Sequence, residues 1–133
     1  MTLAQVTPQE SSSPSQTTVL IAVHAPDVRE GLAAMLGTLD QFRVVGEAGS
    51  NQEALDLARS LRPRLALVDP ELSGNLGWWT MHALQTERLA DAIVALGRRA
   101  DELMAGLVGA RAYVQVGTAP RELVRTLEAV VSQ

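Results

Sequence analysis

Five short runs of apolar residues alternate along this chain with segments whose apolar residues recur at helical spacing. The runs are residues 18–23, 42–48, 64–69, 92–96 and 112–116, and each has about the length of one strand. Strands that are apolar on both faces and are joined by helices are typical of a parallel sheet covered on both sides. The sequence therefore predicts an α/β fold, a doubly wound five-stranded parallel sheet, although the pattern does not determine the order of the strands.

The segments between these runs begin like helices. Pro26 and Asp27 suit the first turn of one helix, and Ser50 with Glu53 fits a capping box at the start of another. Three further helices are predicted over residues 78–89, over 101–108 and from Pro120 onwards. These elements make one domain over residues 17–133, whereas residues 1–16, rich in Ser, Gln, Thr and Pro, are predicted to be a disordered tail.

Composition argues against several classes of function. The 133 residues carry a formal net charge of −4, which gives no electrostatic footprint for nucleic acid or an anionic membrane. The chain has no cysteine, so disulfides, thiol catalysis and thiolate metal sites are excluded. Neither an apolar stretch of membrane-spanning length nor a signal peptide is recognisable, and we expect a cytoplasmic location. All eleven basic residues are arginines, so the chain offers no lysine for any site.

Several segments together resemble one known family. VLIAVHAPDVREGLAAML (19–36), FRVVGEAGSNQEALDLARSLRPRLALVDPELSG (42–74) and VGARAYVQVGTAPRELVRTLEAV (108–130) look like the receiver domain of bacterial two-component response regulators. The resemblance is strongest to the class whose receivers usually precede a helix-turn-helix DNA-binding domain, and it covers roughly residues 18–131. It implies a flavodoxin-like receiver fold with strand order 2-1-3-4-5.

The resemblance also implies a site for phosphoryl transfer to an aspartate, and this chain departs from it at most positions. The acceptor position is Asp69, at the end of the third apolar run. Two acidic residues that normally hold Mg²⁺ correspond to Val23 and His24, which do not replace two carboxylates. The family's Ser or Thr at the end of the fourth strand corresponds to Gly97, or to Leu96 if the alignment shifts by one. Val116 stands in place of the family's lysine.

These departures favour a vestigial Asp69 that caps a strand end or accepts backbone N–H bonds. The alternative is an acceptor that a partner or a small phosphodonor still phosphorylates, which would need other activation. Arg98 and Arg99 are the cations expected near the pocket, as a phosphate clamp or as solvated loop residues. His24 either pairs with Asp69 or fills the vacated metal position without switching anything. His82 has no second ligand one helical turn away, so no metal site follows from it.

Trp79 is the candidate interface residue. Trp78 shares a helix side with Met81 and Leu84 and is expected in the core, whereas Trp79 turns the other way. It either folds back over the pocket or over residues 70–76, or it contacts a partner or a second subunit.

The predicted function is that of a pseudo-receiver, a non-enzymatic module of two-component signalling. It would act by protein–protein contact or homodimerisation, without Mg²⁺-dependent phosphorylation, and we predict no cofactor, no metal and no direct binding of nucleic acid or membrane. The alternatives are a receiver that is phosphorylated on Asp69 and takes part in a phosphorelay, or a receiver-like domain that senses a small molecule in the vacated pocket.

Overall fold

Strands and helices alternate along the chain as the apolar runs predict, except that the third strand is followed by two helices, the first of which was not predicted. The computed structural model describes residues 16–98 and 102–132. The strands are β1 (Thr17–Ala22), β2 (Phe42–Ala48), β3 (Leu65–Val68), β4 (Ala92–Gly97) and β5 (Ala112–Gln115). The helices are α2 (Pro26–Gly37), α3 (Asn51–Leu61), α4 (Leu72–Asn75), α5 (Gly77–Thr86), α6 (Glu102–Leu107) and α7 (Pro120–Val131).

The five strands form one parallel sheet in the order β2-β1-β3-β4-β5, which confirms the predicted topology. β1 lies between β2 and β3, so Ile21 is paired with Glu47 on one side and with Leu67 on the other. Because all the strands run in the same direction, the residues that follow β1, β3, β4 and β5 meet at one edge of the sheet.

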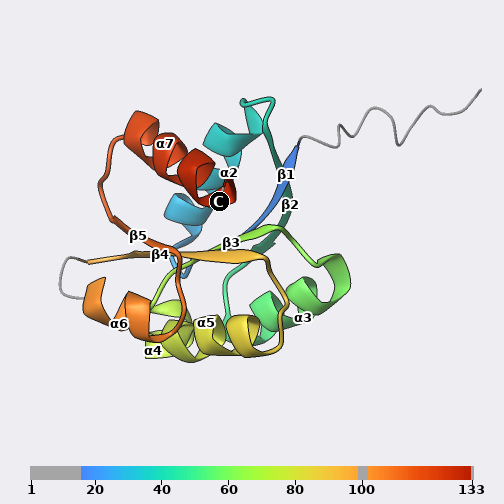
Figure 1. Ribbon diagram of the computed structural model, residues 1–133, viewed down its shortest axis with the longest axis vertical. Helices are drawn as coiled ribbons and strands as arrows, with labels where there is room; N and C mark the ends of the chain where they lie inside the picture. The colour runs from blue at the N-terminus through green and yellow to red at the C-terminus, as the bar shows by residue number, and fades with distance from the viewer. Residues whose placement is uncertain (1–15, 99–101, 133) are drawn as a thin grey trace, which may run out of the picture.

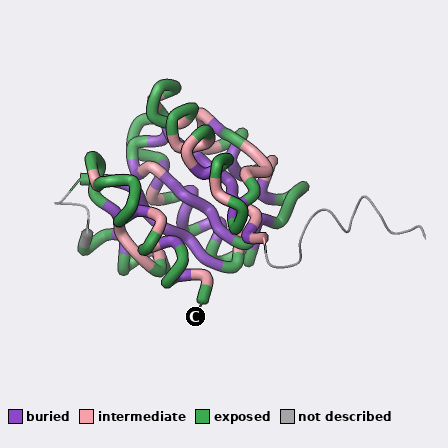
Figure 2. Tube along the Cα trace, turned by 90° about the horizontal axis from the view of Figure 1, so that it is seen from above, coloured by how far each residue is buried: buried purple, intermediate pink, exposed green. Residues whose placement is uncertain are grey.

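Helices cover both faces of the sheet (Figure 1). α2 and α7 lie on one face, where Leu36 and Leu127 pack with Ile21 and Val94. α3 and α5 lie on the other, where the core includes Leu20, Ala66, Ile93, Leu55 and Leu84. Successive strand residues therefore belong to alternate sides, and Figure 2 shows buried residues along the central strands with exposed residues on the outer helix surfaces.

The predicted capping box at the start of α3 is present. The Ser50 hydroxyl accepts a hydrogen bond from the Glu53 backbone N–H at 3.2 Å. The Glu53 carboxylate accepts in return from the backbone N–H of Gly49, at 2.9 Å, one residue before the N-cap. The start of α2 likewise has Pro26 in its first turn and Asp27 beside it. Local sequence thus sets where these two helices begin.

The helix expected over residues 78–89 is shorter than predicted, since α5 ends at Thr86. Arg88 adopts a left-handed conformation (φ 54°), and the Leu89 N–H turns back to the Leu84 carbonyl at 2.9 Å. Leu89 is 3% exposed, so it packs against the core from outside the helix. This is a Schellman-type helix ending, in which an apolar residue just beyond the helix packs back against it. In the sequence, such a residue looks like a further residue of the helix.

The predicted disordered tail lies outside the described residues except for Gln16. The Gln16 side-chain amide donates to the Asp40 carbonyl at 3.2 Å, one residue before β1 begins. Arg99 and the first residue of the helix predicted over 101–108 also lie outside the described part of the chain.

Candidate functional site

A cavity of about 240 Å³ lies at the edge of the sheet where the strands end. Four of the positions singled out from the sequence line it together: Val23 after β1, Asp69 after β3, Gly97 at the end of β4 and Val116 after β5. The sheet topology alone brings them together, because these residues are far apart in the sequence and each follows or ends a parallel strand.

Asp69 connects two loops through its carboxylate. One carboxylate oxygen accepts a hydrogen bond from the His24 backbone N–H at 3.0 Å, and the other accepts from the Glu71 backbone N–H at 2.8 Å. The Asp69 N–H itself donates to the Ala22 carbonyl at 2.9 Å and continues the pairing of β3 with β1. The carboxylate thus connects the loops after β1 and β3.

His24 meets Asp69 only through its backbone in the described part of the chain. Its side chain is exposed, and it is not among the residues that line the cavity. No hydrogen bond joins the imidazole to Asp69. The place beside the acceptor is taken instead by Val23, which is 2% exposed and belongs to the core.

The cavity does not fit Mg²⁺, the metal that the receiver resemblance implies. Its lining contains two carboxylates, and that of Glu71 lies 3.1 Å from the Arg98 guanidinium in an ion pair. Among the described residues, no group of three or more His, Asp or Glu side chains could hold a metal ion. Mg²⁺ requires near-octahedral oxygen ligands, and the valines at positions 23 and 116 supply none.

Gly77 fixes the far side of this site in a way that sequence reasoning did not foresee. A Cβ atom at Gly77 would lie 2.0 Å from the Asp69 carbonyl oxygen and 2.5 Å from the Pro70 Cα. The Gly77 N–H donates to the Pro70 carbonyl at 3.1 Å. Only a glycine lets α5 begin so close to the end of β3, and the Asp-Pro-x₆-Gly spacing was the available signal.

Two apolar surfaces lie away from the cavity. Trp79 on α5 is 55% exposed, while its neighbour Trp78 is half-buried and packs against the core, as expected. On α6, Leu103 and Leu107 are 78% and 72% exposed. The sequence interpretation singled out Trp79 and missed these two leucines, although their spacing of four residues on a short apolar helix was a usable signal.

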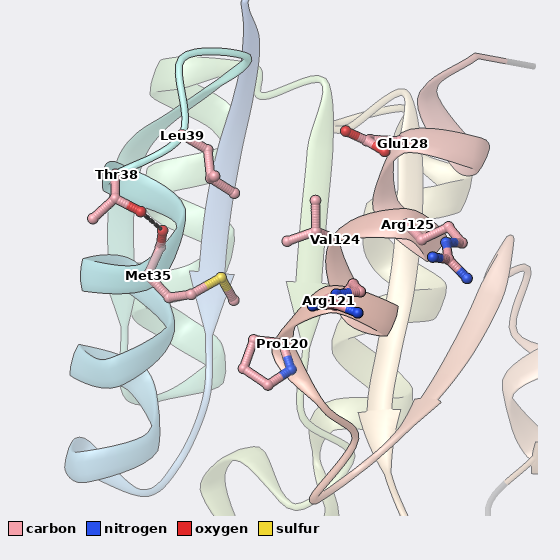
Figure 3. A pocket seen from close by; sticks show the side chains of 8 residues that line it. All are labelled: Met35, Thr38, Leu39, Pro120, Arg121, Val124, Arg125 and Glu128. Carbon is pink, nitrogen blue, oxygen red and sulfur yellow. Dashed lines mark hydrogen bonds between the residues drawn. The ribbon is translucent and has the colours of Figure 1, made fainter.

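A second hollow, of about 410 Å³, lies between the end of α2 and the start of α7 (Figure 3). Met35 and Leu39 face Pro120 and Val124 across it, and Arg125 lies at its side. Its charged lining residues are Arg121, Arg125 and Glu128, and the described residues there include no group of three side chains that could hold a metal ion. The cavity at the carboxyl ends of the strands is therefore the candidate functional site.

Comparison with known proteins places the chain in a family, although no family model matches it. It is 28% identical over 119 residues to the nitrate/nitrite response regulator protein NarL of Escherichia coli K12, covering 87% of this chain and 55% of that protein. It is 31% identical over 117 residues to the transcriptional regulatory protein PdtaR of Mycobacterium tuberculosis, covering 86% and 57%.

Among solved structures, it resembles the signal receiver domain of a modulated diguanylate cyclase from Desulfovibrio desulfuricans G20. The TM-score is 0.77 and the identity 26%, over 88% of this chain and 94% of that domain. The chain is a receiver domain of two-component response regulators. This receiver domain spans a little over half the length of the curated relatives it matches. None of its described helices is long and apolar enough to cross a membrane.

Proposed function

We propose that this receiver domain signals by contact with another protein chain, without Mg²⁺-dependent phosphorylation and without enzymatic activity of its own. The observation that carries the proposal is the cavity at Asp69. Both oxygens of the Asp69 carboxylate accept backbone hydrogen bonds. Val23 and Val116 line the same cavity, at the positions where the family resemblance implies a carboxylate and a lysine.

Phosphoryl transfer depends on positioning and on electrostatic stabilisation of the transferred group. In the described cavity the one cation is the Arg98 guanidinium, and it is paired with Glu71. Gly97 provides no hydroxyl, and Val116 provides no charge. A phosphoryl group on Asp69 would also lack differential contacts with the ends of β4 and β5, so it would not shift the domain between two states.

Exposed apolar side chains support the protein-contact part of the proposal. Trp79, Leu103 and Leu107 are each more than half exposed, and large apolar side chains of this kind favour contact with another chain. The partner is another protein or a second copy of this domain. The net charge of −4 supports the further proposal that the domain does not bind nucleic acid directly.

The test is incubation with acetyl phosphate, or with beryllofluoride, in the presence of Mg²⁺. Intact mass and sedimentation are measured for the wild type, for Asp69→Ala and for Asp56→Ala, whose carboxylate is exposed on α3. We expect no gain in mass and no change in oligomeric state in any of the three. A phosphoryl mass gained by the wild type and by Asp56→Ala but not by Asp69→Ala, with a change in oligomeric state, would show that Asp69 is a working acceptor.

A further inference from the structure

The cavity at Asp69 combines apolar walls with a carboxylate. Six of its lining residues are apolar: Val23, Ala25, Val28, Pro70, Leu96 and Val116. Pockets for small molecules have this composition, with a few polar groups that orient the ligand. The apolar walls exclude a hydrated metal ion as the natural occupant, and they favour a ligand that brings apolar surface of its own.

Two of the exposed large apolar side chains of this domain lie at this cavity. Val28 is 41% exposed and Val116 is 58% exposed, and they approach the cavity from α2 and from the end of β5. Each leaves apolar surface in contact with water, which is unfavourable at about 25 cal/mol per Å². A ligand that lies between them would remove that surface from water on two sides.

The charged side chains that line the cavity determine which polar group of a ligand can bind there. The lining contains two carboxylates, of Asp69 and Glu71, and one guanidinium, of Arg98, which is paired with Glu71. Asp69 accepts two backbone hydrogen bonds, and among the described residues it has no ion-pair partner. A carboxylate has about four acceptor positions, so Asp69 retains acceptor capacity that an apolar ligand would bury unsatisfied. An anionic ligand would meet the carboxylate itself.

We propose that this cavity binds a small primary amine, with its ammonium group on the Asp69 carboxylate and its apolar body between Val28 and Val116. The volume of about 240 Å³ lies below the roughly 300–1,000 Å³ of pockets for drug-sized ligands, which suits a ligand of about ten non-hydrogen atoms or fewer. For so small a ligand we expect a dissociation constant on the order of 1 mM. This proposal rests on the proposed function, because it requires that Mg²⁺ and a phosphoryl group do not occupy the cavity.

Amide NMR of the full chain tests this proposal, because the His24 and Glu71 N–H groups donate to the two oxygens of Asp69 and report on it directly. The probes are benzylamine and n-butylamine, with benzyl alcohol as the neutral counterpart and benzoate as the anionic one. We expect saturable shifts of both amides with at least one amine. The alcohol and benzoate should bind at least tenfold more weakly, because neither offers Asp69 a charged donor.

Three variants separate this site from binding elsewhere. Asp69→Asn should weaken amine binding at least tenfold, because position 69 loses its charge and its one remaining side-chain oxygen accepts only one of the two backbone hydrogen bonds. Val116→Lys should abolish it by placing a tethered ammonium in the cavity mouth. Asp91→Asn is the matched control and should leave binding unchanged, because Asp91 pairs with Arg64 just before β4, at the opposite edge of the sheet.

Equal binding of amine and alcohol, binding that survives Asp69→Asn, or no saturable shift up to about 20 mM amine would each overturn the proposal. Failure of the proposed function is recognised separately. Phosphorylation is followed by the mass gained from acetyl phosphate with Mg²⁺, in the absence of amine. A gain in mass would contradict the proposed function, whereas a lack of amine-induced shifts would contradict the amine site alone.

Discussion

At the scale of single residues, the Asp69 carboxylate connects two loops of the domain. Its two oxygens receive N–H groups from the loops after β1 and β3, at 3.0 and 2.8 Å. Hydrogen bonds to a charged acceptor are worth more than neutral ones, and removing the acceptor leaves both donors without their partner.

We therefore predict that Asp69→Ala lowers the free energy of unfolding by about 1–3 kcal/mol in urea denaturation. The control is Asp56→Ala on α3, whose carboxylate is exposed and pairs with Arg59 at 3.6 Å. That variant should change stability by less than about 0.5 kcal/mol. An Asp69→Ala protein as stable as the control would show that the two hydrogen bonds do not anchor the loops.

Four residues that line the cavity, Val23, Asp69, Gly97 and Val116, could be singled out because their positions at strand ends follow from the alternating pattern and the family resemblance. Acceptance of backbone N–H bonds by Asp69 was one of the alternatives, but the residues that donate them could not be predicted. That His24 would offer its backbone and turn its ring outward depends on the local path of the chain after β1. The ion pair of Glu71 with Arg98 joins two loops whose proximity is a property of the folded sheet. Neither is encoded in a periodic pattern.

At the scale of elements, the junction between β3 and α5 depends on one glycine. Gly77 lies against the backbone of Asp69 and Pro70, so an added methyl group would meet rigid atoms that cannot rotate away. We predict that Gly77→Ala lowers the free energy of unfolding by about 1–3 kcal/mol or more. It should also shift the amide resonances of Asp69 and Glu71.

Gly31→Ala is the matched control for that experiment. Gly31 lies within α2 with no atom within 4 Å of an added Cβ, and alanine favours a helix more than glycine does. We expect this variant to stabilise the domain by about 0.5–1 kcal/mol. Equal effects of the two substitutions would contradict the close packing at Gly77.

Helix α6 carries two leucines that contribute little to the fold. Leu103 and Leu107 are 78% and 72% exposed, whereas Leu127 on α7 is fully buried. Changing both exposed leucines to alanine should alter the free energy of unfolding by less than about 0.5 kcal/mol in thermal unfolding. Leu127→Ala should lower it by about 2–5 kcal/mol. A large loss of stability from the α6 double variant would mean that this surface is structural and not free for contact.

Element types were predictable because the central strands β3 and β4 are wholly apolar and three helices, α2, α3 and α7, have recognisable first turns. Element ends were less so. The sequence of α5 continues to suggest a helix through Leu89, but Arg88 takes a left-handed conformation and Leu89 returns to the core. Whether an apolar residue prolongs a helix or packs from beyond its end depends on the tertiary packing it meets.

At the scale of the whole molecule, the alternating pattern predicts a parallel sheet but leaves its strand order open. The order β2-β1-β3-β4-β5 was expected only from the resemblance to receivers, and the structure confirms it. This order places the ends of β1, β3 and β4 around one cavity. The domain thus has the receiver scaffold, with Val23, Gly97 and Val116 at the positions where the family resemblance implies an acidic, a hydroxyl and a basic side chain.

If the scaffold is intact, restoring two carboxylates should restore metal binding. Val23→Asp with His24→Asp places them after β1, beside Asp69. Without metal this variant should be less stable than the wild type, because like charges repel and Val23 is a core residue. Mg²⁺ relieves the repulsion and should add about 2.7 kcal/mol at a hundredfold excess over its dissociation constant. For a domain of this size that raises the Tm by roughly 5–15 °C.

The wild type should show no such gain when its Tm in MgCl₂ is compared with that in NaCl of equal ionic strength. His24→Asp alone is a milder variant, since His24 is exposed and its replacement leaves the core unchanged. It should respond to Mg²⁺ by a smaller amount, because two carboxylates complete less of the octahedral shell than three. A rise in the Tm of the wild type with Mg²⁺ that Asp69→Asn abolishes would instead mean that the present cavity already holds the metal. The proposal of phosphorylation-independent signalling would then lose the observation that carries it.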